Sequence, residues 1–170
     1  ALAAFLLSTA SIAFAAAPAP VHVALIFDDG PVAASATRLA EILAKENVHV
    51  TFGAVAQKVQ ADPTTAKRLL AAGHELANHS WSHQAPGKID DTALEHEILG
   101  GQKAIAEATG FAPKWYWPPF LAVNDRVLAL TAKAGLTVYK PLHLVASKDY
   151  DTTVTAEQIR QRSVEGVTDG

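Results

Sequence analysis

Residues 22–31 read HVALIFDDGP, and residues 73–83 read GHELANHSWSH. In the first stretch, an apolar run leads directly into two adjacent acids, Asp28 and Asp29. In the second, a short apolar segment leads into a pair of histidines at H-x-x-x-H spacing. Both stretches have the pattern of a buried strand followed by polar side chains, and acids beside paired histidines are the parts of a metal hydrolase.

Outward from these two stretches, short apolar runs alternate with segments of helical periodicity, which is typical of βα units. The predicted strands are residues 22–27, 48–55, 75–78, 115–117 and 136–139. The predicted helices are residues 36–46, 62–73, 91–109, 124–134 and a last helix capped by Thr155. Capping residues at the starts and glycines at the ends support these helices.

Serial βα units build either an α/β barrel or an open doubly wound sheet. The acids follow the first predicted strand, the histidine pair follows the third, and Pro118–Phe120 follow the fourth. All of them therefore fall on the rim made by the carboxyl ends of the strands, where α/β barrels collect catalytic groups. A Rossmann-type sheet would need a glycine fingerprint after its first strand, and the sequence has none there. We therefore expect an α/β fold of the barrel type.

The composition is that of one globular domain. The 170 residues are 49% apolar, carry a net charge of −3 and include no cysteine. A core of useful size is possible at this length, and a disulfide framework is excluded. Because there is no basic stripe with interleaved aromatic residues, we predict no nucleic-acid partner.

The first twenty residues differ from the rest of the chain. Leu2–Ala17 carry no charge and include the A-x-A pattern Ala13–Ala15, which is typical of a signal-peptide cleavage site. We interpret residues 1–20 as the later part of a secretory signal and a spacer, with the natural start upstream, and residues 21–170 as the domain. The alternative is a buried N-terminal helix. The prediction is an exported protein, periplasmic or extracellular, without a stable membrane span in the mature chain.

The acids and histidines suit a catalytic metal site. In a helical turn, His79 and His83 would lie on one side and reach a common ion, although this spacing alone is a weak signal. Two histidines and one aspartate leave open positions on a metal, as catalytic sites do. One acid could bind the ion while its neighbour removes a proton from water. The alternative is an ordinary turn at Asp28–Pro31, which is weakened because an unpaired carboxylate after a buried strand is costly.

These residues resemble the NodB-homology polysaccharide deacetylases, carbohydrate esterase family 4, over residues 22–170. The first family motif, T-F-D-D-G-P, corresponds to Ile26–Pro31, and the second, H-[ST]-x-x-H, to His79–His83. The resemblance implies a distorted (β/α) barrel, here without its C-terminal strand.

The resemblance also implies roles for the site residues. Asp28 would be the general base, and Asp29, His79 and His83 would hold a divalent ion, most often Zn²⁺, with Co²⁺, Ni²⁺ or Fe²⁺ as alternatives. Water on the ion would attack the acetyl carbonyl of an N-acetylated sugar, Asp28 would take the proton, and the ion would stabilise the oxyanion.

The third family motif, R-P-P-Y, corresponds to Trp117–Phe120, so a tryptophan stands where the family has an arginine that pairs with the catalytic acid. Pro119 and Phe120 would contribute to the substrate and oxyanion site, Phe120 through its backbone N–H. Trp117 would belong to the same site. It could form an apolar wall for a sugar ring together with Trp115 and Tyr116, or simply pack in the core.

Two cations could stand in for the missing arginine, namely Arg126, on a predicted helix, and Lys148. The fourth motif, D-x-x-D-W, is reduced to Asp149 and Tyr150, and we assign Asp149 a supporting role. In the family, a histidine on a final strand protonates the leaving amine, and we expect this catalytic acid beyond Gly170.

Among the remaining histidines, His143 is a candidate substrate contact, because it follows the fifth predicted strand on the functional rim. The sequence and the resemblance together predict a metal-dependent polysaccharide deacetylase that acts on a chitin-like or peptidoglycan glycan. Two alternatives are an O-acetyl esterase using the same site and a glycan-binding pseudoenzyme that keeps the metal.

Overall fold

The computed structural model describes residues 23–140, 147–165 and 167 of the chain. They fall into two units, which are residues 23–140 and the described residues from 147 onward, and each is described by itself. The predicted signal and spacer, residues 1–20, and the candidate substrate contact His143 lie outside the described residues. In the described part of the chain, no helix is both long enough and apolar enough to cross a membrane.

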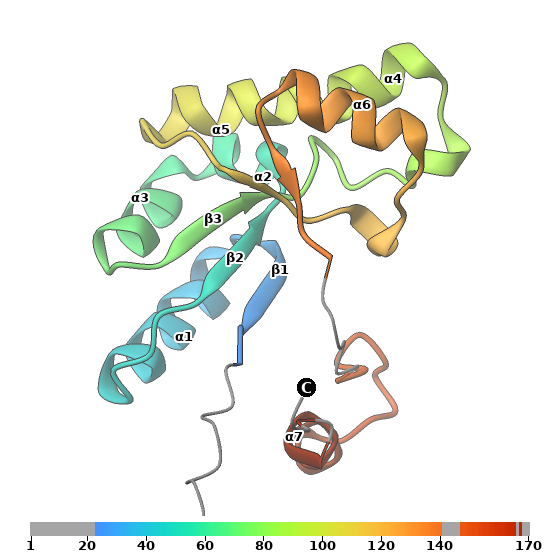
Figure 1. The fold of residues 1–170 in the computed structure, drawn as a ribbon. Helices are drawn as coiled ribbons and strands as arrows, with labels where there is room; N and C mark the ends of the chain where they lie inside the picture. Colours follow the sequence, from blue (N-terminus) through green and yellow to red (C-terminus); the bar gives the residue numbers. More distant parts are fainter. Residues whose placement is uncertain (1–22, 141–146, 166, 168–170) are drawn as a thin grey trace, which may run out of the picture. The chain divides into compact units, whose positions relative to one another are not determined.

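The larger unit is built on a sheet of five parallel strands in the order β1-β2-β3-β4-β5 (Figure 1). The strands are β1 (Ile26–Gly30), β2 (Thr51–Ala54), β3 (Glu75–Asn78), β4 (Trp115–Tyr116) and β5 (Thr137–Val138). Strands that are consecutive in the chain are neighbours in the sheet, as in a barrel, whereas a doubly wound sheet reverses its order part-way. The predicted α/β fold of the barrel type is therefore confirmed.

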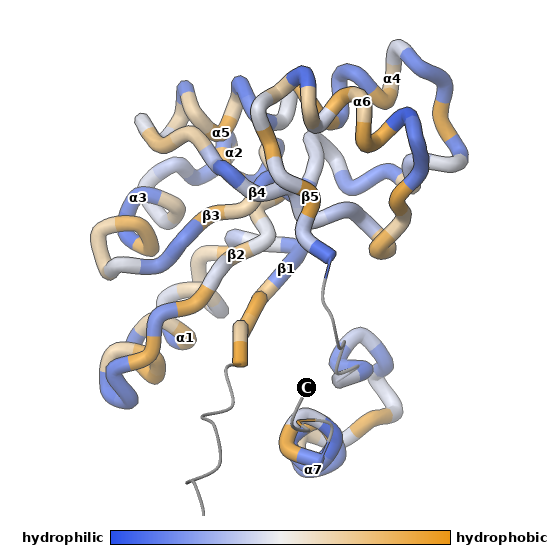
Figure 2. The backbone as a smooth tube through the Cα atoms, in the orientation of Figure 1, coloured by the Kyte–Doolittle hydropathy of each residue, from blue (hydrophilic) through white to orange (hydrophobic). Residues whose placement is uncertain are grey.

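The predicted strand bounds are right for β3 and wrong for β1. We expected the first strand to end at residue 27, with both acids behind it, but β1 continues through Asp28 and Asp29 to Gly30. The reason is that pairing with β2 continues past Phe27, because Gly30 is the partner of Ala54. Figure 2 shows the result, with β1 passing from hydrophobic to hydrophilic residues along its length.

Helices connect the strands and cover the outer side of the curved sheet (Figure 1). They are α1 (Ala33–Lys45), α2 (Ala56–Ala61), α3 (Pro63–Ala71), α4 (Asp91–Glu95), α5 (Gly101–Thr109) and α6 (Asp125–Lys133), with the 3₁₀ turns η1 (Pro86–Lys88) and η3 (Pro119–Leu121). The helix α2 was not predicted, because its six residues are too few to show a helical period. The prediction of Pro63 in the first turn of α3 is confirmed.

The predicted helix over residues 91–109 is interrupted by a π turn. The turn, η2 (His96–Gly100), lies between α4 and α5 and has helical backbone angles at both flanks. Asp90 caps the start by accepting a hydrogen bond from the amide of Ala93, and the segment ends at Gly110. A π turn shifts the side chains after it around the helix, and such turns are common at functional sites.

Two later helices follow their predicted caps. Asn124 accepts a hydrogen bond from the amide of Val127 at the start of α6. In the smaller unit, Thr155 accepts one from the amide of Gln158 at the start of α7 (Ala156–Glu165). Side-chain caps of this kind satisfy amides that have no partner inside the helix.

The two faces of the sheet have different contents. The side chains of Phe27, Phe52 and Leu76 are aligned across β1, β2 and β3 and belong to the main apolar core with α1, α2, α3 and α5. Because side chains alternate along a strand, Asp28, Gly53 and their neighbours on the opposite face point to the inside of the curved sheet. The inner face is therefore where polar groups of different strands can meet.

Candidate metal and base site

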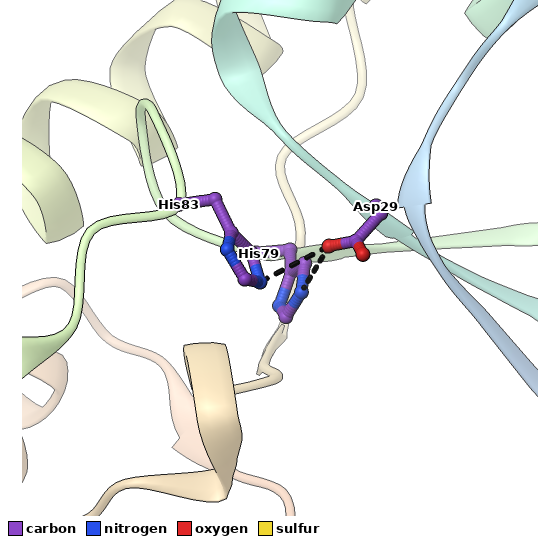
Figure 3. A group of neighbouring side chains, drawn as sticks. All are labelled: Asp29, His79 and His83. Carbon is purple, nitrogen blue, oxygen red and sulfur yellow. Dashed lines mark ion pairs between the residues drawn. The ribbon is translucent and has the colours of Figure 1, made fainter. Parts of the chain in front are cut away.

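A β-bulge in β1 allows both acids to face the same side. Phe27 pairs with Phe52, and Gly30 pairs with Ala54, so two residues of β1 oppose the single Gly53 of β2. Asp29 takes the positive φ of 60° that this bulge requires. In a regular strand, adjacent side chains point to opposite faces, but a bulge re-aims one of them. Asp28 thus reaches the inner face. Asp29 turns toward the histidines (Figure 3).

Asp29, His79 and His83 form a group whose ligating atoms all lie within 4.8 Å of one another (Figure 3). Oδ1 of Asp29 lies 3.3 Å from Nε2 of His79 and 3.0 Å from Nε2 of His83. Two donors about 2.0–2.1 Å from a shared tetrahedral ion lie roughly 3.3 Å apart, so this spacing suits a Zn²⁺-sized ion. The structure brings together the three residues that the sequence proposed as ligands.

His79 is oriented as a metal ligand would be. Its ring is buried, and its Nδ1 lies 2.6 Å from the main-chain oxygen of Trp117, to which it donates as N–H. Nε2 then carries the lone pair, and it makes no hydrogen bond within the described residues. Burial lowers the pKa of His79, and the nearby His83 lowers it further, which favours the neutral ring that binds metals. The donor set therefore fits a divalent ion.

The loop from His79 to His83 is not a helical turn, contrary to our expectation. Ser80 and His83 both have positive φ, 68° and 67°, which no α-helix allows. The hydroxyl of Ser80 accepts a hydrogen bond from the amide of His83 and closes the loop on itself. The two imidazoles meet because of this tight loop, with ring centroids 4.7 Å apart.

The π turn η2 holds this loop at both ends. At one end, Nδ2 of Asn78 donates to the main-chain oxygen of Ile98, while Oδ1 of Asn78 accepts from the amide of Ser80. At the other end, the buried Glu97 accepts hydrogen bonds from the amide and the hydroxyl of Ser82. Burial raises the pKa of Glu97, but these hydrogen bonds outweigh it and keep the pKa below its ordinary value. Glu97 therefore binds the loop as a carboxylate.

Close packing between α5 and the loop depends on Gly101. A Cβ at this position would lie 3.0 Å from the carbonyl carbon of Ser80 and 3.1 Å from both Oδ1 of Asn78 and the amide of Trp81. Real Cβ atoms essentially never approach closer than 3.0 Å, and two of the three neighbours are backbone. The helix can lie against the metal-binding loop because residue 101 has no side chain.

Asp28 lies beside the three donors and is hydrogen-bonded to Trp117, whose Nε1 donates to Oδ2 of Asp28 at 3.0 Å. Arg126 is not a stand-in for the family's arginine, because it pairs with Asp91 at 2.6 Å and donates to the main-chain oxygen of Ile89. The segments after β4 and in β1 thus meet across the inside of the curved sheet.

Of the two alternatives for Trp117, an apolar wall shared with Trp115 and Tyr116 is wrong because of Tyr116. Tyr116 is fully buried in a core cluster with Leu94, Ile98 and Val127, on the opposite face from Trp117. Trp115 is 37% exposed. The reason is the alternation of side chains along the chain at β4, which turns Tyr116 away from the face of Trp115 and Trp117, whose rings both pack against Tyr139.

The turn after β4 places one aromatic ring against the histidines. Pro119 is buried, whereas Phe120 is 67% exposed and has a φ of 56°. The ring centroid of Phe120 lies 4.8 Å from that of His83. The following amides, those of Leu121 and Ala122, donate within the turn. Phe120 thus forms the apolar border of the site.

The family model described as polysaccharide deacetylase matches residues 16–139. The chain belongs to the polysaccharide deacetylase family. Peptidoglycan-N-acetylglucosamine deacetylase PgdA of Listeria monocytogenes is 36% identical over 106 residues, which are 62% of this chain and 23% of that protein. Chitin deacetylase 1 of Cryptococcus neoformans is 31% identical over 130 residues, 76% of this chain and 27% of that protein.

A solved relative confirms the fold of this polysaccharide deacetylase family member. The peptidoglycan deacetylase PdaC of Bacillus subtilis is 29% identical and superposes with a TM-score of 0.78, covering 88% of this chain and 71% of that one. The fold is accordingly the distorted (β/α) barrel, without its C-terminal strand among the described residues. The chain spans about a quarter of the length of the two curated relatives.

Two polar residues at the site of this deacetylase-family chain were missed in the sequence. Lys58 donates to the main-chain oxygen of Asp29 from α2, the helix that was not predicted. Glu97 holds the histidine loop, but nothing in the periodicity of residues 91–109 distinguishes it from surface acids. If a helix had been predicted directly after β2, Lys58 would have been expected near the rim formed by the carboxyl ends of the strands.

The remaining predicted residues of this family member belong to the smaller unit. Asp149 accepts a hydrogen bond from the hydroxyl of Ser147 at 2.7 Å, and its supporting role stays a prediction. The same holds for Lys148 as a stand-in cation and for a catalytic acid beyond Gly170.

Proposed function

We propose that this chain carries the catalytic domain of a metal-dependent deacetylase that hydrolyses acetamido groups on an N-acetylated glycan. The observation that carries the proposal is the convergence of Asp29, His79 and His83 beside a separate carboxylate, Asp28. A structural metal site would have no use for a second acid that is not among the ligands. The chain's membership of the polysaccharide deacetylase family supports the reaction class.

The three donors would hold one divalent ion, most often Zn²⁺ in the resembled family. When bound, such an ion supplies Lewis-acid chemistry, lowering the pKa of water and polarising an acetyl oxygen. His79 presents Nε2 because its other nitrogen is committed to the main-chain oxygen of Trp117. His83 and Asp29 complete a set that leaves positions for water and substrate.

Asp28 is the proposed general base. Its carboxylate lies in the sheet next to Asp29 and is held by the indole of Trp117. A base must stand within hydrogen-bond reach of the proton that it removes, and the position of Asp28 next to the proposed ligand Asp29 on one bulge supports this role. Phe120 borders the same space, and its backbone N–H is our candidate donor to the oxyanion.

The proposed substrate is an acetylated peptidoglycan-like or chitin-like glycan, and the proposed location is outside the cytoplasm. Support for the substrate comes from the relatives, which are named for peptidoglycan and chitin deacetylation. Support for export comes from the predicted signal in residues 1–20. The proposal includes no nucleic-acid partner.

The test is acetate release from N-acetylated chitooligosaccharide and from peptidoglycan fragments by the full-length protein. We expect release that is lost with a chelator and restored by Zn²⁺. Asp28→Asn should keep the bound metal and lose turnover, whereas His83→Ala should lose the metal. Acetate released only from O-acetylated xylan would replace the proposal with an esterase. One bound metal per chain without any release would replace it with glycan binding.

A further inference from the structure

Trp117 contacts both the proposed base, Asp28, and one of the proposed metal ligands, His79. Through its indole it donates to Oδ2 of Asp28, and through its main-chain oxygen it accepts from Nδ1 of His79. Its own amide donates to the main-chain oxygen of Asn78, which fixes its backbone against β3. One residue therefore connects the proposed base to a proposed metal ligand.

The indole N–H of Trp117 can only donate a hydrogen bond. An indole N–H is a donor only, so the hydrogen bond must engage a lone pair of the carboxylate. Trp117 is 7% exposed, and its ring packs against Tyr139, with centroids 5.1 Å apart. A buried donor left without a partner is costly, so the pair with Asp28 is strongly favoured.

The space for this pair is created on β2. A Cβ on Gly53 would lie 3.0 Å from Cβ of Asp28 and 3.3 Å from Cδ1 of Trp117. The absence of a side chain at residue 53 thus lets the tryptophan ring and the aspartate meet. The side chain of Asp28 is confined between the ring of Trp117 and the backbone of Gly53.

Within residues 23–140, no cationic side chain forms an ion pair with Asp28. Arg126 is engaged with Asp91, and Lys58 donates to a main-chain oxygen. The direct partner of the Asp28 carboxylate in this region is the neutral indole.

We propose that Trp117 is a positioning residue for Asp28. Its indole fixes the carboxylate through Oδ2 and leaves Oδ1 for the proton of the attacking water, so the contribution of the indole belongs to turnover and not to substrate or metal binding. This inference rests on the proposed deacetylase function, but the contact that carries it can be tested without activity.

The kinetic test is Trp117→Phe in the full-length, metal-loaded protein. Phenylalanine keeps a ring and the main-chain oxygen but loses the N–H. We expect kcat to fall by roughly ten- to hundredfold, part of the usual contribution of a positioned base, with KM and the bound metal per chain unchanged. The matched control is Trp115→Phe, two residues earlier and more exposed, which should leave kcat unchanged. An unchanged kcat in Trp117→Phe, or a parallel loss of metal, would overturn the proposal.

The second test uses the ¹⁵N-labelled indole groups of the three tryptophans. Trp117→Phe and Trp115→Phe assign their N–H signals by NMR. Asp28→Ala should move the Trp117 signal upfield and leave the other two in place. If the Trp117 signal does not move, the hydrogen bond between Trp117 and Asp28 is contradicted. If the signal moves but the wild type releases no acetate, the contact stands and the deacetylase proposal fails, together with any effect on kcat.

Discussion

The carboxylate of Glu97 accepts hydrogen bonds from both the amide and the hydroxyl of Ser82, at 2.9 and 2.6 Å. Ser82 directly precedes His83, so a buried acid on the π turn fixes the backbone that carries a proposed ligand. Outer groups that orient metal ligands are often nearly as important as the ligands. The π turn therefore belongs to the site, although no hydrogen bond or ion pair joins its residues to the three donors.

The first prediction concerns this contact. Glu97→Gln replaces an acceptor oxygen with an N–H₂ group that cannot accept from Ser82, so the loop should loosen. We expect Zn²⁺ affinity to fall by roughly 10- to 100-fold, measured by competition with a chromogenic chelator. The control is Glu95→Gln, which removes only the exposed pair with Lys133. Equal affinities in wild type and Glu97→Gln would contradict this role.

A second prediction concerns the packing of α5 on the histidine loop. Gly101→Ala places a methyl group against Ser80 and Asn78, and the backbone must shift to accept it. We expect the free energy of unfolding to fall by about 1–3 kcal/mol in urea titrations. Gly87→Ala is the control, because a Cβ there meets no atom within 4 Å. An unchanged free energy of unfolding in Gly101→Ala would show that the loop can shift without cost.

A third prediction follows from the buried His74, which packs edge-on against Phe52. Burial lowers the pKa of His74, and the nearby His49 lowers it further. The unfolded chain therefore binds the proton more readily. The stability that His74 contributes is complete above an unfolded pKa of about 6.5 and is lost as the pH falls toward the lower folded pKa.

His74→Leu should accordingly flatten the fall in unfolding free energy below pH 6.5, by at most about 1.4 kcal/mol per pH unit. The measurement is urea unfolding of the metal-free protein at several pH values. The exposed His96 provides the control, and His96→Gln should leave the wild-type slope in place. Parallel slopes in wild type and His74→Leu would be the contrary outcome.

The exposed ring of Phe120 carries a fourth prediction, which depends on the proposed function. Phe120→Ala removes an aromatic face beside His83 on which a sugar ring can stack. We expect KM for chitooligosaccharide to rise roughly three- to tenfold, with kcat nearly unchanged. Leu128→Ala, an exposed apolar residue on α6, should change neither constant. A lower kcat at constant KM would instead assign the ring to the chemical step.

The sequence predicted the elements whose signals are local. The bounds of β3 and the cap of α6 at Asn124 depend on neighbouring residues only, and both are confirmed. The grouping of Asp29 with the histidines was predictable because parallel strands end on one rim. That these residues bind a metal stays a prediction.

The features that the sequence did not reveal depend on contacts between distant segments. The bulge at Asp29 exists because β1 and β2 pair out of step around Gly53. The π turn changes a helix by one residue, which a period of 3.6 cannot register over so short a segment. The contact of Trp117 with Asp28 joins residues 89 positions apart in the sequence and requires the curvature of the sheet.

The bulged strand β1 has β2 as its only partner among the described strands. Among the described residues, an edge strand leaves part of its backbone groups without a strand partner, and amides without such protection exchange with solvent more readily. Asp29 lies on this strand, whereas His79 and His83 follow β3. An ion bound by these donors would tie the edge strand β1 to the loop after β3. Binding of the ion should therefore slow the amide hydrogen exchange of Ile26–Gly30.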